Sequence, residues 1–248
     1  MAPLFEARGL HLRFGDRVVL EDVSLAFPAG TLSGIMGPNG AGKTTCFNVL
    51  TGRYRPDRGQ VLFGGRDITG MAPHRIARLG IARSFQLMNL FDEFSVFENV
   101  AVALPATRRR VADPVGRAYG EPATVAAAMA VLERVGLADR ADQPAKSLPY
   151  GARRALEIAV ALASDPQLLF LDEPTAGLGS DGRARLAELI RALKRHVTIV
   201  VIEHDMDFLF GLADEISVIH WGQVIARGTP AELKANPWVM ASKLGDGA

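Results

Sequence analysis

The chain has 248 residues, of which 48% are hydrophobic and 22% charged, which is typical of a globular protein with one large α/β domain or a core with an attached subdomain. Its 28 lysines and arginines nearly balance 27 aspartates and glutamates, so a net charge of +1 gives no overall field for nucleic acid or an anionic membrane. The single cysteine, Cys46, excludes an internal disulfide, and we expect it to be a small core residue in a reducing compartment. No signal-peptide-like stretch and no uncharged apolar run of about 18 residues occurs, so we expect a cytosolic chain that acts on membranes only through partners.

Short strands and turns are predicted in the first quarter of the chain. The strand-like runs are residues 18–20, 23–27 and 32–36, followed by a turn-rich hairpin at residues 56–65. Phe14 precedes a glycine in this region, 23 residues before Gly37. An aromatic ring here can stack on a nucleotide base, although a phenylalanine in a strand is usually part of the core.

A glycine-rich loop follows the run at 32–36. It reads Gly37-Pro38-Asn39-Gly40-Ala41-Gly42-Lys43-Thr44-Thr45, which has the form G-x-x-x-x-G-K-T. The glycines let backbone N–H groups turn inward around a polyanion, and a helix predicted from Thr44 to Leu50 adds its partial positive charge. The Lys43 ammonium is suited to the β and γ phosphates, and the Thr44 hydroxyl is placed to coordinate Mg²⁺. The sequence therefore predicts a phosphate-binding loop for MgATP, with residues 37 to 45 as ligands.

The middle of the chain changes to a mostly helical pattern, between about Leu87 and Ala163. Helices are predicted at 124–135 and 152–162, with a polar, proline-bounded loop at 105–114 whose three arginines, Arg108 to Arg110, we expect to be solvated. Gln86 lies where the sheet region passes into this helical block. A glutamine at such a position can coordinate Mg²⁺ or the attacking water.

Strand and helix alternate again in the last third, which favours a doubly wound parallel sheet. Apolar strands are predicted at 168–171 and 197–202, a helix through 186–193, a hairpin at 216–225 and a terminal helix from about Pro230 to Leu244.

Acidic and imidazole side chains follow two of these strands. Asp172 and Glu173 come directly after the strand at 168–171, and His204 ends the next one. The carboxyl ends of parallel strands share one sheet edge, so we expect all three beside the glycine loop. Asp172 is suited to hold Mg²⁺, Glu173 to polarise a water for attack on the γ phosphate, and His204 to donate a hydrogen bond to that phosphate.

Together these residues resemble the nucleotide-binding subunit of ATP-binding-cassette transporters. The ordered set comprises Phe14, the loop at 37–45, Gln86, Leu148-Pro149-Tyr150-Gly151, residues 168–173 and His204, and it spans nearly the whole chain. The resemblance implies an α/β fold: a phosphate-loop (RecA-like) parallel-sheet core with an N-terminal antiparallel β subdomain, formed by residues 1–86 and 164–248, and an inserted helical subdomain at 87–163. It also implies that Pro149, Tyr150 and Gly151 belong to the signature loop, which contacts the nucleotide held by the opposite subunit of a head-to-tail dimer.

Further stretches resemble one branch of that family. They are residues 80–86 with 97–100, and residues 150–159 with 201–207. They are similar to importer ATPases for branched-chain amino acids and related small solutes. The resemblance implies ATP and Mg²⁺ as cofactors, a second ATPase subunit, two membrane permeases and, indirectly, a solute-binding protein. The chain would then lie on the cytoplasmic face of the membrane, with a groove for a permease loop near residues 87–91.

The chain departs from the family pattern at three positions. Pro149 replaces the signature serine and offers neither hydroxyl nor N–H, Ala152 replaces the glutamine that follows, and Gly179 replaces an aspartate. We therefore expect a heterodimer with two unequal sites.

Three other functions remain as alternatives to an importer ATPase. They are an ATPase of another transporter, such as a lipid or lipopolysaccharide exporter, a non-transport ATPase of the same fold, and a regulator without turnover. Neutral net charge argues against a nucleic-acid role, and Glu173 and His204 argue against the regulator.

Overall fold

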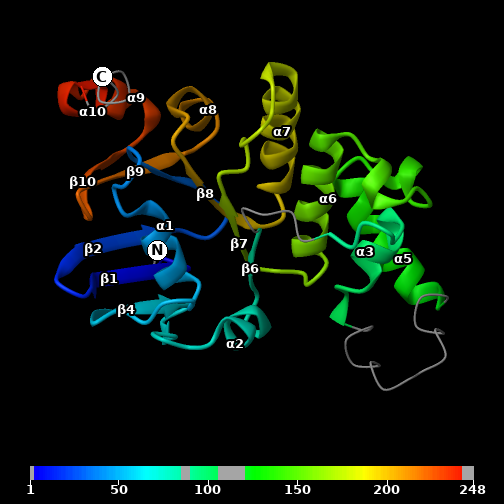
Figure 1. Cartoon of the computed structure of the whole chain (residues 1–248), viewed down its shortest axis with the longest axis horizontal. Helices are drawn as coiled ribbons and strands as arrows, with labels where there is room; N and C mark the ends of the chain where they lie inside the picture. Colours follow the sequence, from blue (N-terminus) through cyan, green and yellow to red (C-terminus); the bar gives the residue numbers. More distant parts are fainter. Residues whose placement is uncertain (1–2, 85–89, 106–120, 242–248) are drawn as a thin grey trace.

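The structure, a computed structural model, describes residues 3–84, 90–105 and 121–241. Two sheets form one half of the molecule (Figure 1). The four-stranded sheet has the order β2 (Arg17–Phe27), β1 (Phe5–Phe14), β4 (Arg58–Phe63), β5 (Arg66–Asp67), with antiparallel pairing throughout. The six-stranded sheet has the order β10 (Gln223–Gly228), β9 (Glu215–His220), β3 (Leu32–Met36), β8 (Thr198–Glu203), β7 (Leu168–Asp172), β6 (Ile81–Arg83).

Five strands of the larger sheet are parallel, and only the edge strand β10 is antiparallel to its neighbour. Alternate residues of these strands enter two separate apolar cores. In β7, Leu169 and Leu171 pack with the helices on one face, whereas Leu168 and Phe170 face α1 and the antiparallel sheet. Phe170 meets the rings of Phe5, at 5.4 Å between centroids, and of two other phenylalanines. Burial on both faces explains why these strands read as continuous apolar runs.

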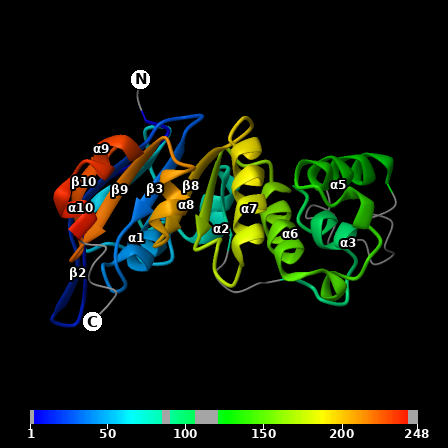
Figure 2. The ribbon, with the colours of Figure 1, turned by 90° about the horizontal axis from the view of Figure 1, so that it is seen from above.

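Helices surround the larger sheet, and a group of them forms the end of the molecule away from the antiparallel sheet (Figure 1). They are α1 (Lys43–Leu50), α2 (Pro73–Arg78), α3 (Val96–Ala101), α5 (Pro122–Arg134), α6 (Tyr150–Leu162), α7 (Ser180–Leu193), α8 (Met206–Phe210), α9 (Pro230–Lys234) and α10 (Pro237–Ala241), with short 3-10 turns at Ala138–Arg140 and Ala145–Ser147. Figure 2 shows α3, α5 and α6 at the end of the molecule farthest from β2, with α7 between them and the sheets. Within the described ranges, every helix is too short or too polar to traverse a lipid bilayer.

The α/β fold expected from the sequence is confirmed, but the strand-like runs at 18–20 and 23–27 are one continuous strand, β2, and the predicted terminal helix is wrong. The terminal helix expected from Pro230 to Leu244 is instead two short helices, α9 and α10, and residues 242–248 lie outside the described part. Pro237 begins the second helix, because a proline lacks the N–H that a continuing helix would need. Cys46 is fully buried, as expected, and this burial raises the pKa of its thiol to about 12.

Candidate functional site

The glycine loop connects the buried end of β3 to the first turn of α1. Gly42 occupies the position before the helix with φ 99°, a left-handed conformation that favours glycine. At Gly37 a Cβ atom would lie 2.0 Å from the carbonyl oxygen of Ile219, so only glycine fits there. Lys43 is 5% exposed, and its ammonium donates hydrogen bonds to the carbonyls of Gly37 (2.7 Å) and Pro38 (2.9 Å). The loop thus curls around the lysine while the first N–H groups of α1 face outward, which is an anion-binding arrangement.

A cleft of about 390 Å³ lies beside this loop. Its lining consists of Phe14, Arg17 and Val19, of Asn39, Gly40, Gly42, Lys43, Thr44 and Thr45 from the loop, and of Glu173. The Phe14 ring is half exposed and packs edge-on against Tyr54, 5.4 Å between centroids. The exposed half of the Phe14 ring is available for stacking. The structure thus brings an exposed aromatic ring, the phosphate-type loop and the Glu173 carboxylate to one cleft, whereas Asp172 and His204 are not among the residues that line it.

Sequence reasoning missed Arg17 and Val19 in this lining. Arg17 pairs with Phe14 at the closed end of the β1–β2 hairpin. The Phe-Gly-Asp-Arg turn was the available signal, because a tight turn places the residues on either side of it opposite each other.

The acidic pair lies at the end of β7, one strand away from β3 across β8. The Asp172 side chain is buried, and burial, together with the neighbouring charge of Glu173, raises the pKa of Asp172 to about 6. Arg83 and Arg154 oppose this rise. The ionised form of the Asp172 carboxyl is disfavoured because little solvent reaches it and because a second negative charge lies nearby. A bound divalent cation would offset both effects.

His204 lies beside Glu173, as predicted for two residues at one sheet edge. The His204 Nδ1 atom is 3.8 Å from a carboxylate oxygen of Glu173 and 3.7 Å from one of Glu203, and the imidazole is half exposed. Glu203, the last residue of β8, is fully buried. The imidazole therefore has carboxylates on its inner side and solvent on the other.

Arg154, on α6, was also missed from the sequence. Its guanidinium is buried, pairs with Glu157 at 2.5 Å, and donates to the carbonyls of Pro174 (3.1 Å) and Glu173 (2.8 Å). This side chain joins the helix to the turn that carries the acidic pair. The sequence around Arg154 carried no signal for that contact, because it joins residues about 20 positions apart through the tertiary fold.

The predicted signature residues are not among those that line the cleft. Pro149 precedes the first residue of α6, and its carbonyl accepts the N–H groups of Ala152 and Arg153, so the helix forms despite the proline. Tyr150 is half exposed, and its hydroxyl donates to the carbonyl of Ala176 at 3.1 Å. The signature loop of this chain therefore lies against the turn after β7 rather than beside Lys43.

Several predicted residues lie outside the described part of the chain. They are Gln86, residues 87–89 of the expected permease groove, and the three arginines at 108–110. From the remainder of that groove, Leu90 is partly buried against the core, while Phe91 is mostly exposed and stacks on Phe94 with centroids 5.0 Å apart.

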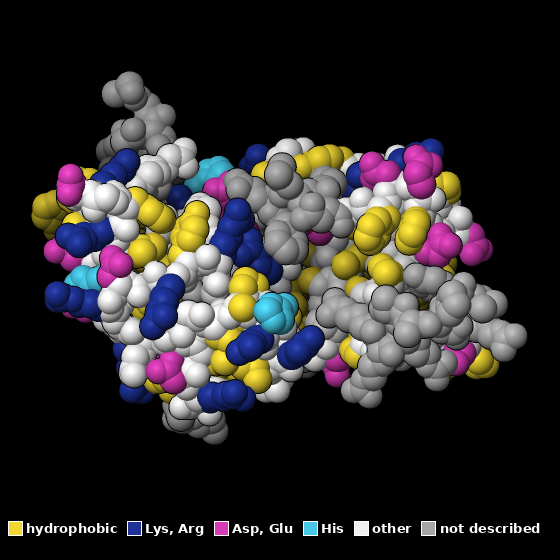
Figure 3. Space-filling view, turned by 60° about the horizontal axis from the view of Figure 1, so that its bottom comes forward, with side chains coloured by type: hydrophobic (Ala, Val, Ile, Leu, Met, Phe, Trp, Pro, Cys, Tyr) yellow, Lys and Arg dark blue, Asp and Glu magenta, His cyan; other side chains and the backbone are white. Residues whose placement is uncertain are grey.

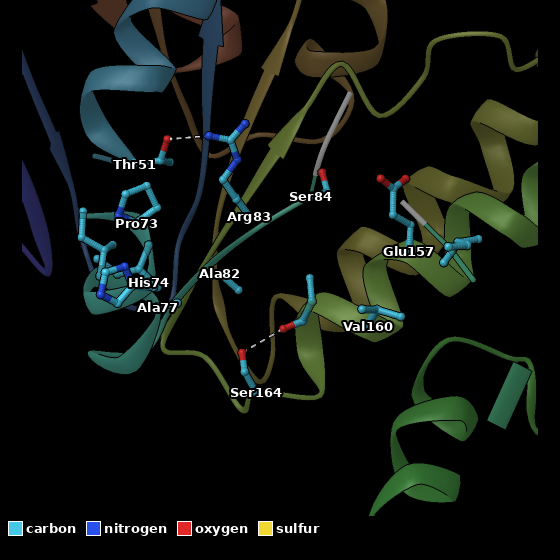
Figure 4. A pocket seen from close by; sticks show the side chains of 14 residues that line it. Thr51, Pro73, His74, Ala77, Ala82, Arg83, Ser84, Glu157, Val160 and Ser164 are labelled. Carbon is cyan, nitrogen blue, oxygen red and sulfur yellow. Dashed lines mark hydrogen bonds between the residues drawn. The ribbon is translucent and has the colours of Figure 1, made fainter. Parts of the chain in front are cut away.

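A second cavity, of about 320 Å³, lies between α2, β6 and α6. Figure 4 shows Pro73, His74 and Ala77 on the left, Val160 on the right, Arg83 and Ser84 above, and Ser164 below. Most of its lining is apolar. The Arg83 guanidinium donates to the Thr51 hydroxyl at the end of α1 (2.9 Å), which connects this cavity to the helix that begins at Lys43.

The strand–glycine loop–helix unit, the buried acid at the end of a strand in the same parallel sheet, and the cleft that the loop shares with Glu173 define a phosphate-loop nucleotide-binding protein. Comparisons with known proteins narrow this class. The family model described as ABC transporter matches residues 20–176, more than half of the chain. The chain belongs to the ABC transporter family and is an ABC-type ATPase.

Three relatives illustrate the range of similar proteins. The high-affinity branched-chain amino acid transport ATP-binding protein LivG of Salmonella typhimurium is 39% identical, over 98% of both chains. The corresponding protein BraF of Pseudomonas aeruginosa is 38% identical over the same shares. The lipopolysaccharide export system ATP-binding protein LptB of Acidithiobacillus ferridurans is 34% identical, over 99% of this chain and 98% of its own.

Solved structures of ATP-binding cassettes are also similar to this chain. An ATP-binding cassette of an ABC transporter in its ADP conformation superimposes with a TM-score of 0.88 at 28% identity, covering 99% of this chain and 100% of the other. A nucleotide-free cassette gives a TM-score of 0.85 at the same identity, covering 98% and 99%. The family resemblance and the α/β fold expected from the sequence are thereby confirmed.

Proposed function

We propose that this chain is the ATP-hydrolysing subunit of a membrane importer for branched-chain amino acids or a similar small solute. The observation that carries the ATPase site is the cleft in which Phe14, the loop from Asn39 to Thr45 and Glu173 meet. The similarity to LivG and BraF over nearly the full length supports the choice of solute.

ATP would lie with its base against Phe14 and its phosphates on the loop. The Lys43 ammonium, already aimed into the loop, supplies positive charge to the β and γ phosphates. Mg²⁺ would be held by the Thr44 hydroxyl and the Asp172 carboxylate, with Gln86 as a further ligand, and would neutralise charge on the phosphate oxygens. The oxygen donors at the first two positions suit this hard cation.

Glu173 is the side chain in the cleft that can accept a proton from the attacking water. His204, 3.8 Å from Glu173, would donate a hydrogen bond to the γ phosphate, and Gln86 would orient the water. The division of roles follows from chemistry: a carboxylate accepts the proton, and an imidazole N–H stabilises the charge that develops on phosphate oxygens.

A second ATPase subunit would complete each site. Pro149, Tyr150 and Gly151 are not among the residues that line this chain's own cleft, which supports a contact with nucleotide bound by the partner. Pro149 offers neither hydroxyl nor N–H, so we propose that the partner is a different subunit whose own signature loop completes the site at Lys43.

The cavity between α2, β6 and α6 is the proposed receiving site for a permease. Its apolar lining suits a short helical segment, and α2, which contributes to that lining, also carries the exposed basic residues Arg75 and Arg78. Basic side chains also gather on the sheet half of the face shown in Figure 3. The partners would be two permeases and, indirectly, a solute-binding protein. Binding to the permeases would place the chain at the cytoplasmic face of the membrane. Residues 87–163 would be the moving helical subdomain, and residues 1–86 and 164–248 would form the core.

Uptake of radiolabelled leucine by a strain lacking this gene tests the proposal. The wild-type gene should restore ATP-dependent uptake, whereas Lys43→Ala should not, because the phosphates lose their point charge. The same chain should co-purify with two permeases. Restored uptake with Lys43→Ala would contradict the ATPase site, and unchanged leucine uptake in the deletion strain would contradict the solute.

Lipopolysaccharide export is the second candidate, favoured by the 34% identity to LptB over 99% of the chain. It predicts that the deletion strain keeps leucine uptake and instead accumulates lipopolysaccharide at the inner membrane. Loss of leucine uptake supports the importer and accumulation of lipopolysaccharide supports the exporter, and both are measured in the same deletion strain.

A further inference from the structure

The turn that begins at Glu173 is held in an uncommon backbone conformation. Glu173 has φ +44°, in the left-handed region that residues other than glycine rarely adopt. Its N–H donates to the carbonyl of Ile202 on β8 (2.9 Å), and its own carbonyl accepts Arg154 (2.8 Å) and the N–H of Ala176 (3.1 Å). Such a conformation persists only where the surroundings determine it from several sides, and these sites concentrate where function needs a fixed geometry.

Glu203 supplies the support for this turn from the side of β8. One oxygen of its fully buried carboxylate accepts both the N–H (2.9 Å) and the hydroxyl (2.5 Å) of Thr175, two residues after Glu173. The other oxygen accepts the N–H of His204 (3.2 Å). One side chain therefore bonds to the segments that carry both Glu173 and His204.

A merely structural role would not require a carboxylate at this place. A buried carboxylate is expensive unless donors satisfy it, and a smaller neutral acceptor could hold the Thr175 N–H. A carboxyl group can accept hydrogen bonds on both oxygens at once, which fixes two segments relative to each other. Glutamine in its place would turn an NH₂ group, which cannot accept a hydrogen bond, toward either Thr175 or the His204 N–H. The hydrogen bond on that side would be lost.

We propose that Glu203 is a positioning residue for ATP hydrolysis: through Thr175 and the His204 backbone it sets the separation of the Glu173 carboxylate and the His204 imidazole. The proposal rests on the proposed function, in which those two side chains act on the γ phosphate. Displacing a reacting group by about 1 Å can cost roughly 100-fold in rate. Loss of this support should therefore reduce the chemical step while leaving nucleotide binding intact, because the glycine loop is carried by a different strand.

The test measures steady-state ATPase activity of the full-length chain assembled with its partner ATPase subunit and permeases, and thermal unfolding of the purified full-length chain. Glu203→Gln should lower kcat about 10- to 100-fold with an unchanged KM for MgATP and an unchanged rise of Tm on adding MgATP. Thr175→Val should act in the same direction, and Thr175→Ser, which keeps the hydroxyl, should restore kcat. Thr198→Val is the matched control: Thr198 is equally buried, at the other end of β8, and its hydroxyl accepts the N–H of Gly30 (2.9 Å).

Both valine variants should lower Tm by similar amounts, and only Thr175→Val should lower kcat. Equal losses of kcat in the two, or wild-type kcat in Glu203→Gln, would overturn the proposal. Glu173→Gln, measured alongside, separates it from the proposed function. If Glu173→Gln loses turnover while Glu203→Gln keeps it, only the positioning role is overturned; if Glu173→Gln itself turns over normally, the catalytic assignment is overturned and the positioning role with it.

Discussion

Asp172→Asn should stabilise the nucleotide-free protein while removing its response to MgATP. Asp172 is 4% exposed, and its pKa rises from the ordinary aspartate value of 3.8 to about 6. At 1.36 kcal/mol per pH unit this difference makes the ionised carboxylate cost the folded state up to about 3 kcal/mol above pH 6. Asparagine has the same shape and no charge, so the variant avoids that cost.

The direction of the Asp172 pKa shift determines the pH range in which the stability changes. A raised pKa means that the folded state binds the proton more tightly than the unfolded state. The contribution of Asp172 is therefore fully favourable below about pH 4, declines as the pH rises through about 6, and stays lost above that value. The variant and the wild type should have similar stability at pH 4 and should diverge between pH 4 and 7.

Thermal unfolding in EDTA, without nucleotide, measures this effect. One kcal/mol corresponds to about 2–4 °C for a chain of this size, so Asp172→Asn should raise Tm by several degrees at pH 7.5. Asp139→Asn is the control, because its side chain is 77% exposed and its Tm should not change. MgATP should then raise the Tm of wild type and of the control, but not of Asp172→Asn. A lower Tm for Asp172→Asn, or a difference independent of pH, would refute the electrostatic reasoning.

Three other predictions follow from the same geometry. Glu173→Gln should keep its affinity for ATP while turnover falls about 100-fold or more, and it should elute from a sizing column as an ATP-bound dimer; wild-type turnover would reassign the base. Gly177→Ala should cost about 1–2 kcal/mol of unfolding free energy, because φ is +76° and the added Cβ would lie 2.8 Å from the Tyr150 hydroxyl; an unchanged urea midpoint would contradict this. In a reconstituted transporter, replacing Gly151 should reduce transport-coupled ATPase activity less than the matching substitution in the partner, because Pro149 already costs this loop a hydrogen bond worth about 1.5–3 kcal/mol; equal losses would refute the asymmetry.

The phosphate-binding loop was determined by the sequence alone. Its glycines, Lys43 and Thr44 all lie within residues 37–44, so their spacing is fixed by the chain and does not depend on the rest of the fold. The buried strands were equally readable, because burial on both faces of a parallel sheet requires continuous apolar runs such as 168–171. The shared edge of Asp172 and the loop, 129 positions apart, followed from the parallel-sheet rule.

Only the tertiary structure decided which side chains support this site. Arg154 and Glu203 hold the turn after β7 through backbone carbonyls and Thr175, and hydrogen bonds to main-chain groups leave no characteristic spacing in the sequence. The place of Arg17 in the cleft, in contrast, follows from the local β1–β2 turn, whose signal the sequence does carry. A ligand site formed by residues that are close in sequence can be predicted from the sequence alone. Long-range contacts that fix its geometry appear only when distant strands and helices meet, because many different residues can satisfy the same buried donor or acceptor.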